Sequence, residues 1–181
     1  LKSGIKSTAI FHDLYLNNEN GKYSQIDLVV ATKVGIVVFE VKEYSGWIFG
    51  NENQINWTQI LAYGKRKYRF YNPILQNEKH IEDLKKFYHF DNIPVFSMIV
   101  FFGDCKFKNL IDLPSRTFLT KSNKAMMRFN EILENNQPAK YGNKWEIANL
   151  LKQAVKNGEN SIIREKHIKN IEKIKARNRI Y

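Results

Sequence analysis

The chain has 181 residues, of which 43% are hydrophobic and 13% aromatic, and no apolar run reaches the roughly 20 residues of a membrane-spanning helix. This composition excludes a wholly disordered chain and a transmembrane protein. Because 29 Lys and Arg stand against 18 Asp and Glu, the formal net charge is +11, and we expect a polyanionic partner, with nucleic acid favoured over an anionic membrane.

The length indicates one domain, or a small core with a helical arm. We expect a core over residues 1–120 and a helical extension, or a connector to a following domain, over residues 121–181. The chain begins at Leu1 and its first methionine is Met98, so we also expect a piece of a longer polypeptide. The single cysteine, Cys105, excludes an internal disulfide and favours a reducing, cytoplasmic compartment. The abundance of Lys, Asn and Ile is typical of an AT-rich bacterial source.

The first part of the chain predicts three consecutive strands. They cover residues 7–16, 23–31 and 34–42, and the third is rich in β-branched and aromatic residues. An Asn-rich turn that ends at Gly21 separates the first two strands, and Thr32 and Lys33 separate the second from the third. Residues 45–57 are polar, with Trp47 and Trp57 near the ends, and predict a loop or an irregular hairpin.

The remainder predicts helices around one further strand. Asn72 is a favourable N-cap and Pro73 a favourable first residue, so a helix is expected from there to about Phe90. Residues 94–103 predict a strand buried on both faces. After Leu119 the chain is expected to be helical, over residues 122–135, 143–156 and 161–179. This order of elements predicts a layered α/β fold.

Two carboxylates lie in strands that are otherwise apolar. Asp27 is in the second strand, and Glu40 and Lys42 share one face of the third. A carboxylate in such a stretch is costly unless it is paired or binds a metal. If the two strands pair as a hairpin, Asp27 and Glu40 converge, and with the carbonyl of Val41 they form an oxygen site suited to Mg²⁺.

A lysine beside such a site is useful for phosphodiester hydrolysis. Lys42 can orient or deprotonate an attacking water, or offset the charge that develops on a phosphate. The pattern acid-x-Lys is weak by itself, because Asp83-Leu-Lys85 and Asp104-Cys-Lys106 also contain it. Only the pattern at Glu40 has a second carboxylate on the preceding strand, and the alternative is a functionless pair of charges at a strand end.

Four segments occur in an order typical of one family. They are Ser-Gln-Ile-Asp at 24–27, Gly-Ile-Val-Val-Phe-Glu-Val-Lys at 35–42, Gly-Trp-Ile-Phe-Gly at 46–50 with Trp57 after it, and Asn-Pro-Ile-Leu-Gln at 72–76. Over roughly residues 7–102 the sequence therefore resembles the nuclease-related domain, often called NERD, of the PD-(D/E)xK restriction-endonuclease-like superfamily.

This resemblance implies a restriction-endonuclease-like mixed β-sheet flanked by helices, and Mg²⁺-dependent cleavage of DNA with Mn²⁺ as a substitute. It implies that Asp27 and Glu40 bind the metal, that Lys42 is the catalytic lysine and that Gln76 is the helix-borne glutamine that assists. The family usually has an upstream helix with a glutamate near the site. No such helix precedes Ser7, so we expect poor metal binding if that glutamate contributes.

The resemblance also implies a module of a larger bacterial protein, for instance beside a helicase-like or kinase-like part. A homodimer would make double-strand cuts easier to explain. We expect DNA contacts from a segment at 65–71 that interleaves cations with aromatic rings, although a solvated amphipathic strand fits that segment equally well. The candidate DNA-binding residues are Lys65, Arg66, Lys67, Arg69 and Lys79.

The last segment, residues 161–181, holds seven Lys or Arg against two Glu. We expect its isoleucines to pack on the body and its charges to have a modest phosphate role. The alternatives are a basic arm, a connector, or a helix on an anionic membrane. For His80, one turn after Gln76, a surface position is favoured over a phosphate contact, and Cys105 is expected to be inert.

These observations predict a metal-dependent nuclease domain that acts on DNA with little intrinsic sequence specificity and without a membrane partner. The alternative is a non-catalytic DNA-binding or assembly module that keeps the same fold.

Overall fold

The computed structural model describes residues 6–17, 22–61, 64–88, 92–108 and 113–178. A short 3-10 helix, η1 (Ser7–Ala9), precedes the first strand. The strands are β1 (Ile10–Asn17), β2 (Tyr23–Thr32), β3 (Gly35–Glu43), β4 (Gly46–Phe49), β5 (Asn56–Leu61), β6 (Arg66–Tyr71), β7 (Val95–Phe102), β8 (Cys105–Lys108) and β9 (Thr117–Lys121). The helices are α1 (Pro73–Tyr88), α2 (Ser122–Glu134), α3 (Lys144–Glu159) and α4 (Ser161–Asn178).

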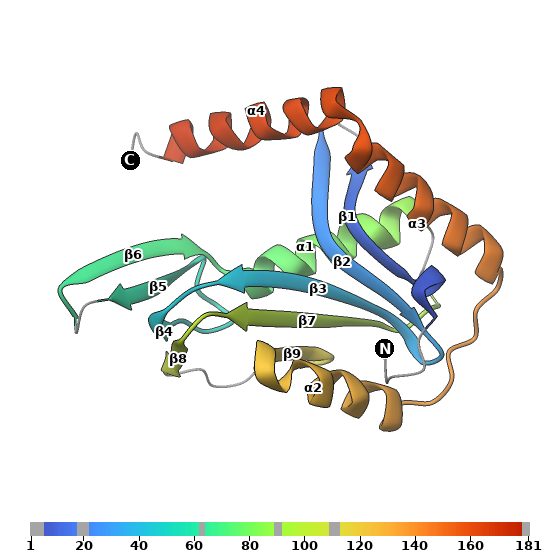
Figure 1. The fold of residues 1–181 in the computed structure, drawn as a ribbon, viewed down its shortest axis with the longest axis horizontal. Helices are drawn as coiled ribbons and strands as arrows, with labels where there is room; N and C mark the ends of the chain where they lie inside the picture. Colours follow the sequence, from blue (N-terminus) through green and yellow to red (C-terminus); the bar gives the residue numbers. More distant parts are fainter. Residues whose placement is uncertain (1–5, 18–21, 62–63, 89–91, 109–112, 179–181) are drawn as a thin grey trace.

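The larger sheet is mixed and has the strand order β1-β2-β3-β7-β9 (Figure 1). β1, β2 and β3 are antiparallel neighbours, whereas β7 runs parallel to β3 and β9 parallel to β7. A tight turn joins β2 to β3: Thr32 is opposite Gly35, and its hydroxyl donates to the Gly35 carbonyl at 2.7 Å. The predicted strands at the start of the chain and after the first helix are confirmed, except that the first begins at Ile10, after η1, instead of at Ser7.

A smaller sheet has the order β6-β5-β4-β8, with β4 and β8 parallel and the other pairs antiparallel. The hairpin expected as one alternative over residues 45–57 is confirmed, because β4 and β5 are antiparallel neighbours, although β5 extends to Leu61. The sequence analysis did not predict the strands β8 and β9. Both are short, with four and five residues, and show too few alternating apolar positions to be recognised.

Helices cover both faces of the larger sheet, as Figure 1 shows. One hydrophobic cluster joins β1, β2 and β3 to Leu84 of α1 and to three side chains of α3. A second cluster, on the other face, joins β2, β3 and β7 to Phe129 and Ile132 of α2. A third surrounds Trp57 and Phe101 and lies between the two sheets. The expected restriction-endonuclease-like α/β fold is confirmed. The domain boundary at residue 120 stays a prediction. α2 and α3, which follow that residue, share hydrophobic clusters with the larger sheet.

α4 contacts α3 and β2. His167 anchors it, because its Nδ1 lies 2.8 Å from the carbonyl oxygen of Tyr23 and its ring meets Tyr15 edge to face. The expectation that the isoleucines of this helix pack on the body is wrong for Ile162 and Ile168, which are exposed. Within the described ranges, no helix has the length and apolar character needed to cross a membrane.

The docking of α3 on β1 requires a small residue at Gly158, where an added Cβ would lie 2.3 Å from the Asp13 carbonyl oxygen. We expect Gly158→Ala to lower the free energy of unfolding by about 1–3 kcal/mol, because the overlap outweighs the higher helix propensity of alanine. Urea denaturation measures the change. Gly142→Ala is the control, since its Cβ meets nothing within 4 Å. Equal stabilities of the two variants would contradict this packing.

Candidate active site

The candidate site lies where β2 separates from β3. The two strands pair from Thr32 opposite Gly35 to Leu28 opposite Phe39, whereas β2 goes on pairing with β1 as far as Tyr23. Beyond Leu28 the β1–β2 hairpin therefore turns away from β3, as Figure 1 shows. Continuing the register places the next residue, Asp27, opposite Glu40. The ladder thus ends at the two carboxylates that the sequence singles out.

The Asp27 carboxylate meets the backbone of β3. Its Oδ2 accepts a hydrogen bond of 2.8 Å from the Val41 N–H, a backbone donor just past the end of the β2–β3 ladder. Burial is the largest influence on the pKa of Asp27 and raises it, and the Val41 hydrogen bond and the charge of Lys42 offset this only in part. The ionised carboxylate of Asp27 is therefore incompletely compensated.

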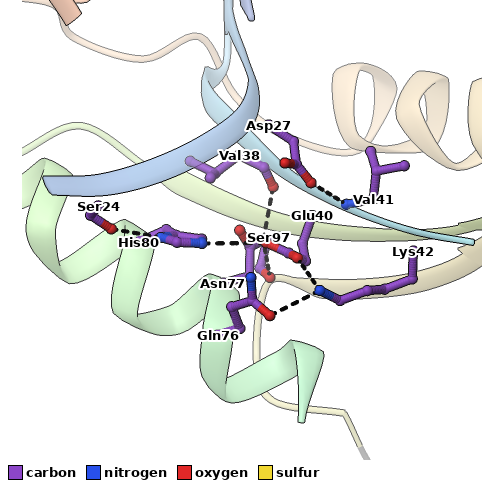
Figure 2. A network of polar contacts seen from close by, with 10 residues as sticks. All are labelled: Ser24, Asp27, Val38, Glu40, Val41, Lys42, Gln76, Asn77, His80 and Ser97. Atoms are coloured by element: carbon purple, nitrogen blue, oxygen red, sulfur yellow. Dashed lines mark hydrogen bonds and ion pairs between the residues drawn. The ribbon is translucent and has the colours of Figure 1, made fainter. Parts of the chain in front are cut away.

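Glu40 is only 2% exposed, yet both of its oxygens face cationic or polar partners. Oε1 lies 2.5 Å from Lys42 Nζ, and Oε2 lies 3.3 Å from His80 Nε2 (Figure 2). Burial alone would raise the pKa of Glu40, but the contacts with His80 and Lys42 outweigh it and leave the pKa lowered. Glu40 is therefore a buried carboxylate that stays ionised.

Lys42 also contacts α1, because its Nζ donates to Gln76 Oε1 at 2.9 Å. Gln76 and His80 are four residues apart on the helix, so both face β3. The structure thus brings together Asp27, Glu40, Lys42 and Gln76, while their catalytic roles stay predictions. Val41 contributes its backbone N–H to the site through the hydrogen bond to Asp27. The predicted metal-binding role of the Val41 carbonyl stays a prediction.

The preference for a surface position at His80 is wrong. The side chain is 8% exposed, and its Nδ1 lies 3.0 Å from Ser24 Oγ of β2. His80 therefore connects β2, through Ser24, with the Glu40 carboxylate on β3 (Figure 2). The four-residue spacing from Gln76 was the available signal, because it places both side chains on one face of a helix.

A fully buried asparagine fixes α1 across the sheet. Asn77 Nδ2 donates to the Val38 carbonyl of β3 at 3.0 Å and to Ser97 Oγ of β7 at 2.8 Å. Asn72 begins the helix as expected, since its Oδ1 accepts from the Ile74 N–H at 2.9 Å. The role of Asn77 has no signal in the sequence, because its partners lie on strands distant along the chain.

The candidate DNA-binding residues fall into two groups. Lys65 precedes β6 and Arg66, Lys67 and Arg69 lie on it, and all four are exposed. β6 continues through Asn72 directly into α1, so these cations adjoin the helix that carries Gln76. Lys79 differs, because its Nζ lies 2.8 Å from Asp83 Oδ1 and 3.6 Å from Glu82 Oε2 on its own helix. Its charge is thereby partly neutralised.

The donor set can be compared with the needs of a metal. Among the described residues there is no group of three or more His, Cys, Asp or Glu side chains spaced for a metal ion. Mg²⁺ is commonly bound by one or two carboxylates together with water and substrate phosphates. Each oxygen of Glu40 has two lone pairs, so it can face Lys42 or His80 and still bind a cation. Asp27 and Glu40 therefore fit Mg²⁺ completed by a phosphate better than a closed zinc site.

The sequence matches a family described as the nuclease-related domain over residues 1–102, a range that includes Asp27, Glu40, Lys42 and Gln76. The chain belongs to the nuclease-related domain family. An uncharacterized protein of Bacillus anthracis is 35% identical to it over 105 residues. That alignment covers 58% of this chain and 48% of the relative, so the chain spans about half the length of this relative. No solved structure gives a significant match.

Within this nuclease-related domain, we expect Asn77→Ala to lower the free energy of unfolding by about 1–3 kcal/mol, because it leaves the buried Val38 carbonyl without its side-chain donor. Chemical denaturation measures the loss. Asn130→Ala serves as the matched control, since Asn130 is exposed on α2. A stability of Asn77→Ala equal to that of the control would show that this contact does not fix α1.

Proposed function

We propose that this chain is a metal-dependent nuclease domain that hydrolyses DNA phosphodiester bonds with low intrinsic sequence specificity. The observation that carries the proposal is the convergence of two carboxylates and a lysine at the fork between β2 and β3. Asp27 and Glu40 come from different strands, and Lys42 is bonded both to Glu40 and to Gln76 of α1. Membership of the nuclease-related domain family supports it.

The charges of the site favour a bound cation. Two carboxylates face one lysine, and that lysine is already engaged by Glu40 at 2.5 Å. Burial raises the pKa of Asp27, so its negative charge lacks full compensation within the protein. A divalent cation shared by Asp27 and Glu40 would remove this imbalance. Mg²⁺ suits two carboxylate oxygens, and Mn²⁺ takes the same ligands.

Each residue then has a defined part in the reaction. When bound, the metal supplies a lowered pKa for water and charge stabilisation for the phosphate. Lys42 Nζ, which contacts Glu40 and Gln76, is placed to donate to the attacking water or to a phosphate oxygen. Gln76 accepts from Lys42 and thereby holds that ammonium group in place.

His80 acts in this proposal as a positioning residue. Its Nε2 faces Glu40 Oε2 at 3.3 Å, and its Nδ1 meets Ser24 Oγ at 3.0 Å. A metal-binding carboxylate that is held by a second group has a fixed orientation, and loss of such support commonly lowers metal affinity or activity. Low sequence specificity follows from the predicted DNA contacts, which are exposed cations suited to phosphates rather than to base edges.

Nicking of supercoiled plasmid by the purified chain with Mg²⁺ or Mn²⁺ tests the proposal. We expect Glu40→Gln and Lys42→Ala to reduce the nicking rate at least about a hundredfold, because each removes a group that stabilises the reacting phosphate or its cation. Lys85→Ala is the control, since Lys85 belongs to the same acid-x-Lys pattern but is exposed on α1. Thermal unfolding shows that each variant is folded.

Two outcomes would overturn the proposal. Nicking that persists in both Glu40→Gln and Lys42→Ala would remove the catalytic assignment. DNA binding by the intact chain without any nicking, with either metal, would favour the alternative of a non-catalytic DNA-binding module with the same fold.

For His80 we expect the Ala substitution to lower nicking by about 10–100-fold and to raise the concentration of Mg²⁺ that gives half-maximal rate. His80→Gln should recover part of the loss, because its amide can still donate to Glu40. Ser24→Ala should have a smaller effect, since it removes only the outer partner. If His80→Ala lowers the melting temperature but leaves the Mg²⁺ dependence unchanged, His80 is structural only.

A further inference from the structure

The β6-β5-β4-β8 sheet has one buried and one exposed face. Ile48, Trp57 and Cys105 point inward and are fully buried in the cluster between the two sheets. The residues between them in sequence alternate to the other side. Figure 1 places this sheet at one end of the molecule, away from α2 and α3.

Strand register sets two rows of side chains across the exposed face. One row runs from Lys67 on β6 through Ile60 and Trp47 to Lys106 on β8. The next row is Arg69, Thr58, Phe49 and Lys108. In both rows a cation on each edge strand flanks uncharged residues on the two central strands. We call this surface of eight residues the outer face.

Charge on the outer face has one sign. The four strands of the sheet contain five Lys or Arg and no Asp or Glu, and four of those cations lie on the outer face. All four are exposed. Three strand spacings of about 4.8 Å separate the two edges, so the cations border a track about 14 Å wide. The acids next to these strands in sequence include Asp104, directly before β8, and Glu43, three residues before β4.

Exposed aromatic rings lie on the same face. Trp47 is 39% exposed on the central strand β4, and Tyr71, at the end of β6, is 48% exposed. Lys108 Nζ lies 5.7 Å from the centre of the Trp47 ring. A hollow of about 340 Å³ adjoins Trp47. It is lined by Ser45, Gly46, Trp47, Ile60, Leu61, Asp104 and Lys106.

We propose that the outer face binds single-stranded DNA, with phosphates at the Lys67–Arg69 and Lys106–Lys108 edges and a base stacked on Trp47. DNA as the polyanion rests on the proposed function. Its single-stranded form follows from the aromatic rings, because an exposed ring can stack only on a base that is not already stacked in a duplex. Cations that alternate with exposed rings are typical of surfaces that follow a single strand.

The outer face is joined to the candidate active site by two short connections. Trp47 is five residues from Lys42, so their Cα atoms lie at most about 18 Å apart. On the other side of the sheet, β6 passes through Asn72 into the helix that carries Gln76. A DNA strand held on the outer face therefore lies within reach of the candidate active site, where β2 separates from β3. The proposal thus specifies single-stranded DNA as the form on which the proposed reaction acts.

Fluorescence anisotropy of a labelled 12-nucleotide oligo(dT) in EDTA, with the full chain, tests the proposal without cleavage. We expect Trp47→Ala to weaken this binding about tenfold and to leave binding to a 12-base-pair duplex unchanged. Lys106→Ala/Lys108→Ala should weaken binding to the single strand to a similar degree and reduce its salt dependence. Lys152→Ala/Lys156→Ala is the matched control, because it removes the same charge from exposed positions on α3.

Several results would overturn the proposal. They are unchanged oligo(dT) affinity in Trp47→Ala, an equal loss in the α3 control, or tighter binding of an oligoribonucleotide, a duplex or anionic vesicles. Trp47→Phe guards against a folding defect, since it keeps a ring and should retain part of the affinity. The two proposals can fail separately. If the outer face binds single-stranded DNA but no metal-dependent nicking occurs, only the proposed nuclease reaction is refuted. If nicking depends on Glu40 but the outer-face variants bind DNA unchanged, only the proposed binding surface is refuted.

Discussion

The ionised carboxylate of Glu40 inside the sheet is the constraint on which the candidate site depends. A charge in such an environment is tolerated only when it is paired, and removal of one partner of a buried pair typically costs several kcal/mol. Lys42 provides one partner from the same strand, and His80 provides the other from α1. The pairing therefore requires that α1 lie against β3 in one position. Asn77 supplies that position by bonding to both β3 and β7.

The positive and negative charges of the chain are kept in separate places. The net charge is +11, and the cations of β6 and β8, with those of α4 up to Lys173, are exposed. Asp27 and Glu40 instead lie at the end of a strand ladder, where a backbone amide, a lysine and a histidine are their neighbours. Exposed cations attract a phosphate backbone over distance, and a pair of carboxylates attracts a cation at close range.

Much of the larger sheet and of the candidate site could be predicted from the sequence, because their signals are local. Carboxylates at Asp27 and Glu40 interrupt apolar strands, and Asn72 with Pro73 marks the start of α1. In the smaller sheet the β4–β5 hairpin could be predicted as an alternative, but β8 could not, since it is short and pairs with β4, which is distant along the chain. His80 is buried against Ser24, which is 56 residues away along the chain. Ile162 is exposed because of the position of α4 on the rest of the fold. Both features arise from tertiary contacts, which leave no periodic pattern in the sequence.

The tight turn between β2 and β3 has a consequence for how this chain can vary in length. The turn sets the count of residues from Asp27 to Glu40, and the two carboxylates meet only because that count keeps them opposite each other. An insertion of one residue, if absorbed by a slip of the strands, would move every side chain of one strand to the other face. The apolar character of the hairpin would survive, but the two carboxylates would lie on opposite sides of the sheet. Surface loops elsewhere can lengthen at little cost, whereas here the spacing itself specifies the site.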